Sequence, residues 1–426
     1  MDPFKINIED VDNGAVSCVH EGKDSQYCEA GKTVKLRWQP TAGWGLQEAH
    51  YTDGDGNVTA IVGGSFIMPS KDVTIGATFK RFSLQDWTGK GNAGDSGSRP
   101  TLGSDDAGFT YYDTDLKRVV VWDGSGWRNV DGTHIPLTFI GRNASAAVAV
   151  FQNNENASEE FPALDIALQY STDGGVTWNS YTVKAGGDAQ DADATFIDIR
   201  NGATVMFRGV NVRVGDYSTE DGEGCYLQFA IDGNVAATGD VTSLLNGQGG
   251  NAVLDDAAFY SMFQGCTGLT AAPALPATTL AQGCYYYMFQ GCTGLTTAPA
   301  LPATTLAPSC YSYMFQGCTG LTAAGYVAAT TSLTQTNCMA SMFAGCTHLE
   351  TTHFASLGSA SANIFQNNAA AVSLTIDATT PPTIASSTLT GLKATCKIFV
   401  PASAVSAYKS KQYWSARSSY IEAMPS

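Results

Sequence analysis

Cysteine and histidine are the residue types of this chain best suited to metal or redox chemistry. Seven of the eleven cysteines recur at two fixed positions of a repeated segment. The spacing of Cys338 and Cys346 to His348 and His353 matches no established zinc site. We therefore expect no metal and no cofactor, and free thiols packed in columns rather than disulfides, which stay the alternative. The columns are Cys266, Cys292, Cys318 and Cys346, and Cys284, Cys310 and Cys338.

Acidic residues form one pattern that could bind calcium. Asp53, Asp55 and Asn57 are spaced as in a calcium-binding loop, but Gly64 stands where a bidentate glutamate is needed. The pattern therefore favours a plain hairpin turn.

A second acidic pattern runs from Ser171 to Trp178 and fits S-x-D-x-G-x-T-W. It resembles the Asp box of sialidase propellers, but a propeller needs several copies, and no glycosidase carboxylate pair can be assigned. We interpret it as a hairpin in which Asp173 and the glycines shape the turn while Trp178 caps the core. The chain also lacks a nucleophile elbow, phosphate loop, HExxH motif and Rossmann fingerprint, so we expect no catalytic residues and no enzyme activity.

Tyrosines on adjacent repeats are the candidate binding residues. Tyrosine combines a large apolar face with a hydroxyl, so such a strip could contact a glycan or a protein. The alternative is that the rings only stack between the buried columns. The candidates are Tyr285, Tyr286, Tyr287, Tyr311 and Tyr313.

The repeat itself is marked by Met-Phe pairs that begin at Met262, Met288, Met314 and Met342. Apolar residues at i, i+4, i+5 and i+8 predict one turn-rich helical segment per repeat, and a short strand follows near Leu269. Such units stacked side by side predict a leucine-rich-repeat solenoid. Its predicted core is Met262, Phe263, Cys266, Leu269, Cys284, Met288, Phe289, Cys292, Leu295, Cys310, Met314, Phe315, Cys318, Leu321, Cys338, Met342, Phe343, Cys346 and Leu349.

These repeats resemble BspA-like leucine-rich repeats, through Cys284, Met288, Phe289, Cys292, Leu295, Leu301 and Pro302. A degenerate unit is expected at Ile364-Phe365, and another at Leu244-Leu245. The C-terminal segment resembles the closing segment of the same family and predicts a cap with a short helix over VSAYKSKQYW. The residues that carry this second resemblance are Thr380-Pro-Pro382, Ile398-Phe-Val-Pro401, Val405, Ala407-Tyr408-Lys409 and Trp414.

Two shorter resemblances lie near the N-terminus. Residues 31–80 resemble an internalin-type B-repeat, a β-grasp-like spacer or protein-interaction module of bacterial surface proteins, through Gly31, Pro40, Gly43-Trp44, Phe66-Ile-Met-Pro69 and Asp72-Val-Thr-Ile. Residues 99–127 resemble a short module of phage tail and tail-fibre proteins, through Arg99-Pro-Thr101, Gly108-Phe109, Tyr111-Tyr112-Asp113-Thr114, Trp122-Asp-Gly124 and Trp127. The aromatic residues of the module at 99–127 could stack on sugar rings, although filling a small core is the favoured interpretation.

Alternating strands between turns at intervals near ten residues predict a β-sandwich over 134–250. The fold class expected is mainly β and multi-domain, with β-grasp-like and β-sandwich modules before a leucine-rich-repeat (α/β) solenoid and its C-terminal cap. The predicted segments are 1–82 (B-repeat-like), 83–133 (linker and aromatic hairpin), 134–250 (sandwich), 251–370 (solenoid) and 371–426 (cap).

The net charge of −16 and the lack of a basic cluster argue against nucleic-acid binding. The sequence has no run of 18 apolar residues, so it predicts no membrane-spanning helix. The N-terminus has neither a basic start nor an apolar region, so we expect no signal peptide. We expect a virion host-recognition protein, either a phage tail fibre or receptor-binding protein or its equivalent in a phage-tail-like particle. Its expected partners are a bacterial surface glycan or protein, other tail or baseplate proteins, and copies of itself. The alternative is a bacterial cell-surface adhesin, extracellular, that lacks its export signal.

Overall fold

The computed structural model describes residues 3–12, 14–20, 23–40, 44–61, 65–81, 93–94, 96, 99, 109–122, 127–129, 133–218, 222–331 and 333–425. Its described part is mainly β and contains several sheets. The chain divides into two compact units, Met1–Thr133 and His134–Ser426. Most of the predicted linker after residue 82 lies outside the described residues, as do Gly43, Gly64, Pro100, Thr101, Gly108, Asp123 and Gly124.

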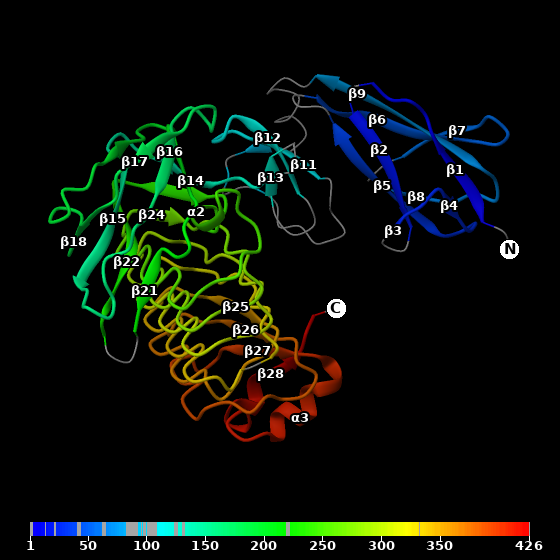
Figure 1. Ribbon diagram of the computed structural model, residues 1–426. Helices are drawn as coiled ribbons and strands as arrows, with labels where there is room; N and C mark the ends of the chain where they lie inside the picture. The colour runs from blue at the N-terminus through cyan, green and yellow to red at the C-terminus, as the bar shows by residue number, and fades with distance from the viewer. Residues whose placement is uncertain are drawn as a thin grey trace. The chain divides into compact units, whose positions relative to one another are not determined.

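The first part of unit Met1–Thr133 consists of two β-sheets with one core between them (Figure 1). The strands are β1 Phe4–Ile8, β2 Gly14–His20, β3 Lys23–Asp24, β4 Tyr27–Cys28, β5 Thr33–Pro40, β6 Trp44–Asp53, β7 Val58–Ala60, β8 Ser65–Ile67 and β9 Val73–Arg81. Their orders are β4-β1-β9-β6-β7 and β3-β2-β5-β8. Ile6, Val34, Phe66 and Ile75 are buried together in this core, since alternate residues of each strand face the same side. The described residues of this part form no helix.

The second part of this unit is a small aromatic sheet. It contains β10 Ala93–Gly94, β11 Thr110–Asp113, β12 Arg118–Trp122 and β13 Trp127–Asn129, in that order. Tyr111 is buried, and the Trp127 ring lies against the rings of Phe109, Tyr111 and Trp122 at centroid distances of 6.3, 5.8 and 5.7 Å. The aromatic residues therefore fill a small core, as the favoured interpretation expects.

Unit His134–Ser426 begins with two facing sheets. The strands are β14 Leu137–Gly141, β15 Ala147–Asn156, β16 Leu168–Ser171, β17 Asn179–Tyr181, β18 Lys184–Gly186, β19 Ile197–Asp198, β20 Thr204–Gly209, β21 Gly215–Tyr217, β22 Gly224–Asp232, β23 Val235–Thr238 and β24 Leu269–Ala271. One sheet has the order β17-β16-β20-β14-β23-β24, and the other β18-β15-β22-β21 with β19 beside β15. Phe139, Phe207 and Phe229 meet between the sheets, with Phe139 and Phe229 centroids 4.9 Å apart.

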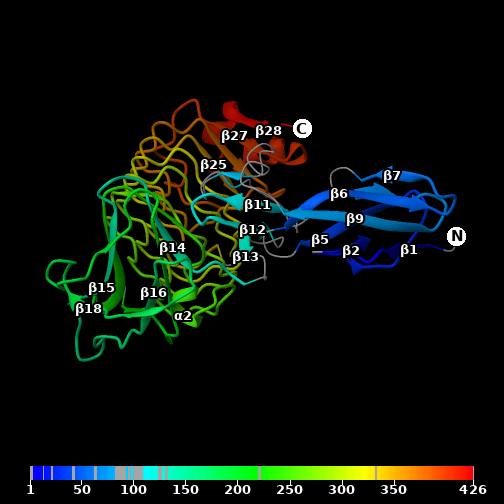
Figure 2. The same cartoon turned by 90° about the horizontal axis from the view of Figure 1, so that it is seen from above.

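The repeats stack as successive coils in register (Figure 1, Figure 2). One half of each coil is a run of turns, over residues 256–265, 282–291, 308–317 and 336–345. Within a run, alternate backbone N–H groups donate to the next coil, as Phe289 N does to Met314 O at 2.9 Å and Gly291 N does to Gln316 O at 2.8 Å. The other half is extended and forms parallel bridges, such as Leu301 to Val327 and Val327 to Phe354.

The helical segment predicted for each repeat is wrong. Every fourth residue of a turn run has a positive φ, as Gly283 (59°), Tyr287 (58°) and Gly291 (71°) do in one coil. A left-handed residue at this interval interrupts an α-helix, so the N–H groups bond across to the neighbouring coil instead of four residues back. The apolar spacing is real, but it belongs to a chain of tight turns.

Each coil buries a phenylalanine directly over that of its neighbour. The rings of Phe263, Phe289, Phe315 and Phe343 stack at centroid distances of 5.3, 5.4 and 5.3 Å and at interplanar angles of at most 6°. All nineteen residues of the predicted repeat core are buried. Ile364-Phe365 continues the stack, because Phe343 N donates to Ile364 O at 3.0 Å.

The sandwich and the coils share one hydrophobic core. Strand β24 belongs to the first coil and pairs with β23 of the sandwich, and Phe229 stacks on Phe263 at 5.3 Å. The core and the sheet therefore cross the segment boundary predicted at 250/251. Leu244 and Leu245 lie in the helix α2 Ser243–Asn246, which packs against β20, so the repeat unit predicted there is wrong.

The C-terminal part forms a parallel sheet in the order β25 Thr351–Phe354, β26 Ser373–Ile376, β27 Lys397–Val400 and β28 Ile421–Ala423. Between β27 and β28 the chain forms the helix α3 Val405–Ser410, which is flanked by the 3-10 helices η3 Ala402–Ala404 and η4 Ser415–Tyr420. Trp414 is fully buried and its Nε1 donates to Pro382 O at 2.9 Å. Tyr408 is also buried, and its hydroxyl donates to Ala378 O at 2.9 Å.

Candidate recognition surface

Two of the five predicted binding tyrosines are not accessible. Tyr285 and Tyr311 are each 1% exposed and stack in a buried column below Phe259. Phe259 occupies the same repeat position, 26 residues before Tyr285 and 52 residues before Tyr311. An apolar residue at this position was the sequence signal that the two tyrosines are buried. The prediction of ligand contact is wrong for these two residues.

The other three, Tyr286, Tyr287 and Tyr313, are half-buried and lie together. Tyr287 is 4.4 Å from Tyr286 at an interplanar angle of 81°, and 5.1 Å from Tyr313 at 40°. Because these ring planes are not parallel, the group presents ring faces as well as edges. We call the group with its continuation the tyrosine strip, composed of Tyr217, Tyr226, Tyr260, Tyr286, Tyr287 and Tyr313.

Sequence reasoning missed the part of the strip that begins on the sandwich. Tyr217 of β21 stacks on Tyr260 of the first coil at 4.0 Å, and Tyr226 of β22 lies 4.9 Å from Tyr260. Tyr260 in turn stacks on Tyr286 at 5.5 Å. The repeat period could have found Tyr260, which precedes Tyr286 by 26 residues, but only the fold brings in Tyr217 and Tyr226.

Three hydroxyls of the strip, those of Tyr226, Tyr260 and Tyr286, stay protonated at neutral pH. Burial raises the pKa of Tyr226 to about 12, and it raises the pKa values of Tyr260 and Tyr286 further. Neighbouring tyrosines add to the increase in each case. The hydroxyls of these three residues are therefore neutral O–H groups, which can donate and accept hydrogen bonds.

A ladder of glutamine side chains runs beside the strip. Nε2 of Gln264 donates to Oε1 of Gln290 at 2.5 Å, and Nε2 of Gln290 donates to Oε1 of Gln316 at 2.6 Å. The first glutamine of the ladder is joined to the sandwich, because Nε2 of Gln228 donates to Gln264 O at 3.1 Å. Gln228 and Tyr226 are two residues apart on β22 and thus share its outer face. We call Gln264, Gln290 and Gln316 the glutamine ladder, and strip and ladder together the tyrosine–glutamine face.

The coil residues that carry this face lie in a segment without ionic charge. Between Asp256 and Glu350 the sequence contains no aspartate, glutamate, lysine or arginine, although the whole chain has a net charge of −16. Polar contacts from these coils are therefore made by hydroxyl, amide and backbone groups.

A second polar cluster lies on the outer face of the parallel sheet. Oδ1 of Asp377 is 2.7 Å from His353 Nε2, and its Oδ2 accepts a hydrogen bond of 2.9 Å from the Tyr326 hydroxyl. Burial, followed by the contact with Asp377, raises the pKa of Tyr326 to about 12. The Tyr326 ring is 40% exposed and meets His353 at 4.8 Å. This cluster is charged, unlike the tyrosine–glutamine face.

The seven cysteines of the two columns are buried free thiols, as expected for packed thiols. Sγ of Cys292, Cys318 and Cys346 each donates to the carbonyl of a phenylalanine in the preceding coil at 3.0 Å. Burial raises the pKa of Cys266 and Cys318 to about 12, so these thiols are poor nucleophiles and poor metal ligands. No group of three or more metal-binding side chains occurs among the described residues.

Both acidic motifs are hairpin turns. Oδ1 of Asp53 accepts the backbone N–H groups of Asp55 and Asn57 at 3.0 and 2.9 Å in the turn between β6 and β7. Asp173 likewise accepts from the backbone and hydroxyl of Thr177 between β16 and β17. Trp178 does not cap the core as predicted, because it is half-buried beneath the Arg208 guanidinium, 3.9 Å from its ring.

Several residues of the sequence pattern at 99–127 contact one another around Asp113. This carboxylate is fully buried, and its Oδ2 accepts from Arg99 Nε and from the Ser96 hydroxyl at 2.7 Å each. Its Oδ1 accepts from Leu116 N at 2.8 Å. The Arg99 guanidinium also lies 5.7 Å from the Trp127 ring. Residues from the start, the middle and the end of the pattern thus meet at one buried ion pair, Arg99–Asp113, and the Trp127 ring beside it.

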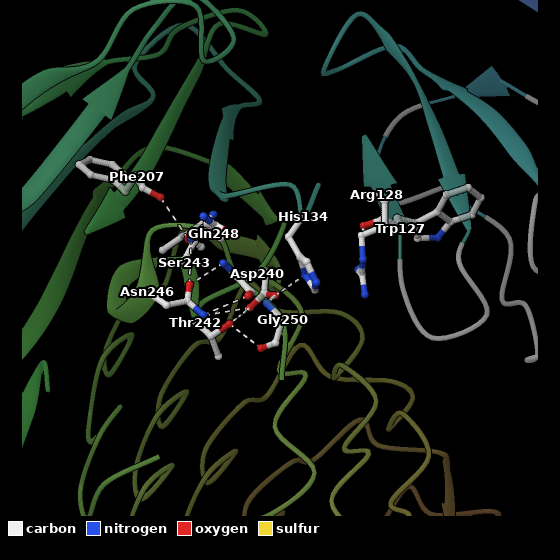
Figure 3. A network of polar contacts seen from close by, with 12 residues as sticks. Trp127, Arg128, His134, Phe207, Asp240, Thr242, Ser243, Asn246, Gln248 and Gly250 are labelled. Carbon is white, nitrogen blue, oxygen red and sulfur yellow. Dashed lines mark hydrogen bonds and ion pairs between the residues drawn. The ribbon is translucent and has the colours of Figure 1, made fainter. Parts of the chain in front are cut away.

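A buried polar network fixes the chain where the sandwich leads into the coils (Figure 3). Oδ2 of Asp240 is 2.9 Å from His134 Nδ1, and its Oδ1 accepts from the backbone and hydroxyl of Thr242 at 2.8 and 2.7 Å. Gly250 N donates to Asp240, and Gly250 O lies 2.7 Å from Thr242 Oγ1 as a second acceptor near its single proton. All acceptors of this carboxylate are occupied by the fold, so the network is structural.

No protein-family model matches the chain, and no curated protein matches it. In the described part of the chain, no helix has the length and apolar character needed to cross a membrane.

Proposed function

We propose that this chain is a virion host-recognition protein, such as a phage tail fibre or receptor-binding protein, or its equivalent in a phage-tail-like particle. In this proposal residues 251–370 are a BspA-like leucine-rich-repeat solenoid, closed by the cap at 371–426, and the solenoid contacts the bacterial surface. The N-terminal modules space the solenoid from the particle or attach it there. The observation that carries recognition is the tyrosine–glutamine face, a partly exposed array of rings and amides on uncharged coils.

The virion location rests on residues 99–127. The support is their sequence resemblance to a module of phage tail proteins, whose matching residues Arg99, Asp113 and Trp127 lie together in this fold. A sequence pattern whose residues contact one another in the fold is a more specific basis for a resemblance than a shared content of aromatic residues. The B-repeat-like and BspA-like segments are equally compatible with a bacterial cell-surface adhesin, so location is what the experiment must decide.

The test measures where the chain is found. Antibody against the purified chain is used to probe density-purified particles from a lysed culture and the envelope fraction of intact cells. Detection in particles, together with binding of the purified chain to cells in a panel of bacterial strains, supports the proposal. Detection in envelopes and not in particles would favour the adhesin instead.

A further inference from the structure

We propose that the tyrosine–glutamine face binds a neutral polysaccharide, which names the ligand class for the proposed recognition function and rests on that function. The first argument is charge. On the coil part of the face an anionic polymer would meet no basic residue and a cationic one no carboxylate, and on the sandwich part Asp216, beside Tyr217, is already paired with Arg213. A neutral polymer avoids both penalties, since its hydroxyls need only neutral donors and acceptors.

The second argument is hydrogen bonding. An amide side chain carries two N–H donors and an oxygen with two lone pairs. In the ladder Gln290 uses one N–H toward Gln316 and one lone pair toward Gln264. One donor and one acceptor remain on an amide that is already held in place. This pairing suits a hydroxyl group, which both donates and accepts.

The third argument is preorganisation. Tyr287 and Tyr313 are half-exposed, yet each is fixed by contacts with other rings of the strip. Rings that are already ordered lose little side-chain entropy on binding, so an apolar sugar face can stack on them without a large entropic penalty.

The fourth argument is periodicity. The coils repeat with the spacing of the phenylalanine stack, 5.3–5.4 Å, so equivalent rings recur on two adjacent coils and equivalent amides on three. A polymer with a regular repeat can use several such positions at once, which a single compact ligand cannot do. The face therefore fits a linear chain of sugars.

Other repeats of the chain show which residues can replace those of the face in a test. Ser261 and Ser341 occupy the repeat position of Tyr287 and Tyr313 with the same left-handed backbone, at φ values of 50° and 52° against 58° and 56°. Tyr287→Ser combined with Tyr313→Ser should thus remove two rings and keep the fold. As a second variant, Gln290→Ala uses the residue found at the equivalent Ala344. Tyr326→Ser on the charged cluster is the matched control.

Full-length wild type and variants are measured by biolayer interferometry against immobilised bacterial polysaccharides, separated on an anion exchanger into neutral and acidic fractions. Binding of labelled chain to the strain panel is measured in parallel. We expect binding to the neutral fraction that is insensitive to added NaCl. The double tyrosine variant should lose about tenfold or more in affinity and Gln290→Ala should lose less, while Tyr326→Ser should bind as wild type. Unchanged thermal unfolding of each variant shows that the fold is kept.

The possible failures are distinguishable. Cell binding that persists in the double tyrosine variant, or that follows the acidic fraction or a protease-sensitive receptor, overturns the polysaccharide proposal and leaves host recognition in place. Loss of binding in Tyr326→Ser alone moves the site to the charged cluster and also overturns it. Binding to neutral polysaccharide without binding to any strain supports the ligand class and counts against the host-recognition function.

Discussion

At the residue scale, a phenylalanine and a cysteine of each coil fill its interior and contact the neighbouring coils. The phenylalanine fills the coil centre and stacks on its neighbours, as Phe289 does between Phe263 and Phe315. The cysteine is small enough to fit between coils, and its thiol donates to a backbone carbonyl that faces the interior. Serine at that position would bring a more strongly hydrated hydroxyl into an apolar column. The pairing explains why these two residue types recur together.

Truncation of one stacked ring tests this packing. Phe289→Ala should lower the free energy of unfolding by about 3–5 kcal/mol, because the cavity lies between two rings that cannot move together. Thr293→Ala, at an exposed position of the same coil, is the control and should be nearly neutral. The measurement is thermal and urea denaturation of the full chain. A near-neutral Phe289→Ala would contradict the stacked core.

The thiols give a second prediction at this scale. All eleven cysteines are buried, and burial raises the pKa of those in the columns above the ordinary thiol value. Because the thiolate is the reactive form, the native protein should show no rapidly reacting thiol toward a disulfide reagent at pH 8. All eleven should react after unfolding in guanidinium. A stoichiometric fast phase in the native state would show that the columns are open.

At the element scale, two glycines of the same turn have different roles. Gly291 has a φ of 71°, and a Cβ there would lie no closer than 3.8 Å to its neighbours. Gly294 has an ordinary φ, but a Cβ there would be 2.4 Å from Thr267 O of the preceding coil. The first glycine is needed for backbone conformation and the second for close approach of the coils.

Alanine at these two positions should therefore have unequal effects. Gly291→Ala should destabilise by about 1–2 kcal/mol, the usual energy of a left-handed alanine. Gly294→Ala should destabilise more, since two backbones must separate. Denaturation midpoints of the two variants decide the order, and equal midpoints would indicate that the coils are not packed backbone to backbone.

The hairpin between β16 and β17 is expected to depend on pH. Hydrogen bonds from Thr177 and Ser171 hold the pKa of Asp173 well below its usual range. A carboxylate with a lowered folded-state pKa stabilises above its unfolded pKa near 4, and that contribution disappears as the pH falls toward the folded value. Asp173→Asn should lower the melting temperature at pH 7 more than at pH 3. An equal change at both values would show that the charge is not involved.

The sequence predicts some of these elements and not others, for physical reasons. The period and the buried positions are visible because phenylalanine, cysteine and leucine recur at fixed spacing. The turn runs are not visible, since residues as different as Gly283, Tyr287 and Asn337 adopt the same left-handed conformation. That conformation is imposed by bonds to the next coil, and the local sequence carries little sign of it. The same holds for Tyr217 and Tyr226, which reach the strip only through sheet pairing.

At the scale of unit His134–Ser426, the sandwich acts as the N-terminal cover of the coils. Phe229 of β22 takes the place of a coil phenylalanine, because it stacks on Phe263 and its carbonyl accepts the Cys266 thiol at 3.2 Å. Its backbone N–H donates to Met262 O at 2.9 Å. An end of a repeat stack exposes apolar surface unless another element covers it. Here the sandwich covers one end and the segment with α3 covers the other.

Truncation tests this dependence. Residues 134–426 expressed alone should unfold in one cooperative transition, because sandwich and coils share a core. Residues 251–426 should fail to do so and should bind a hydrophobic dye, since removal of the sandwich exposes the Phe263 ring and leaves β24 without its partner β23. Differential scanning calorimetry and dye fluorescence of the two fragments make the comparison. If residues 251–426 melt cooperatively without dye binding, the coils are self-sufficient and the sandwich is only an attached module.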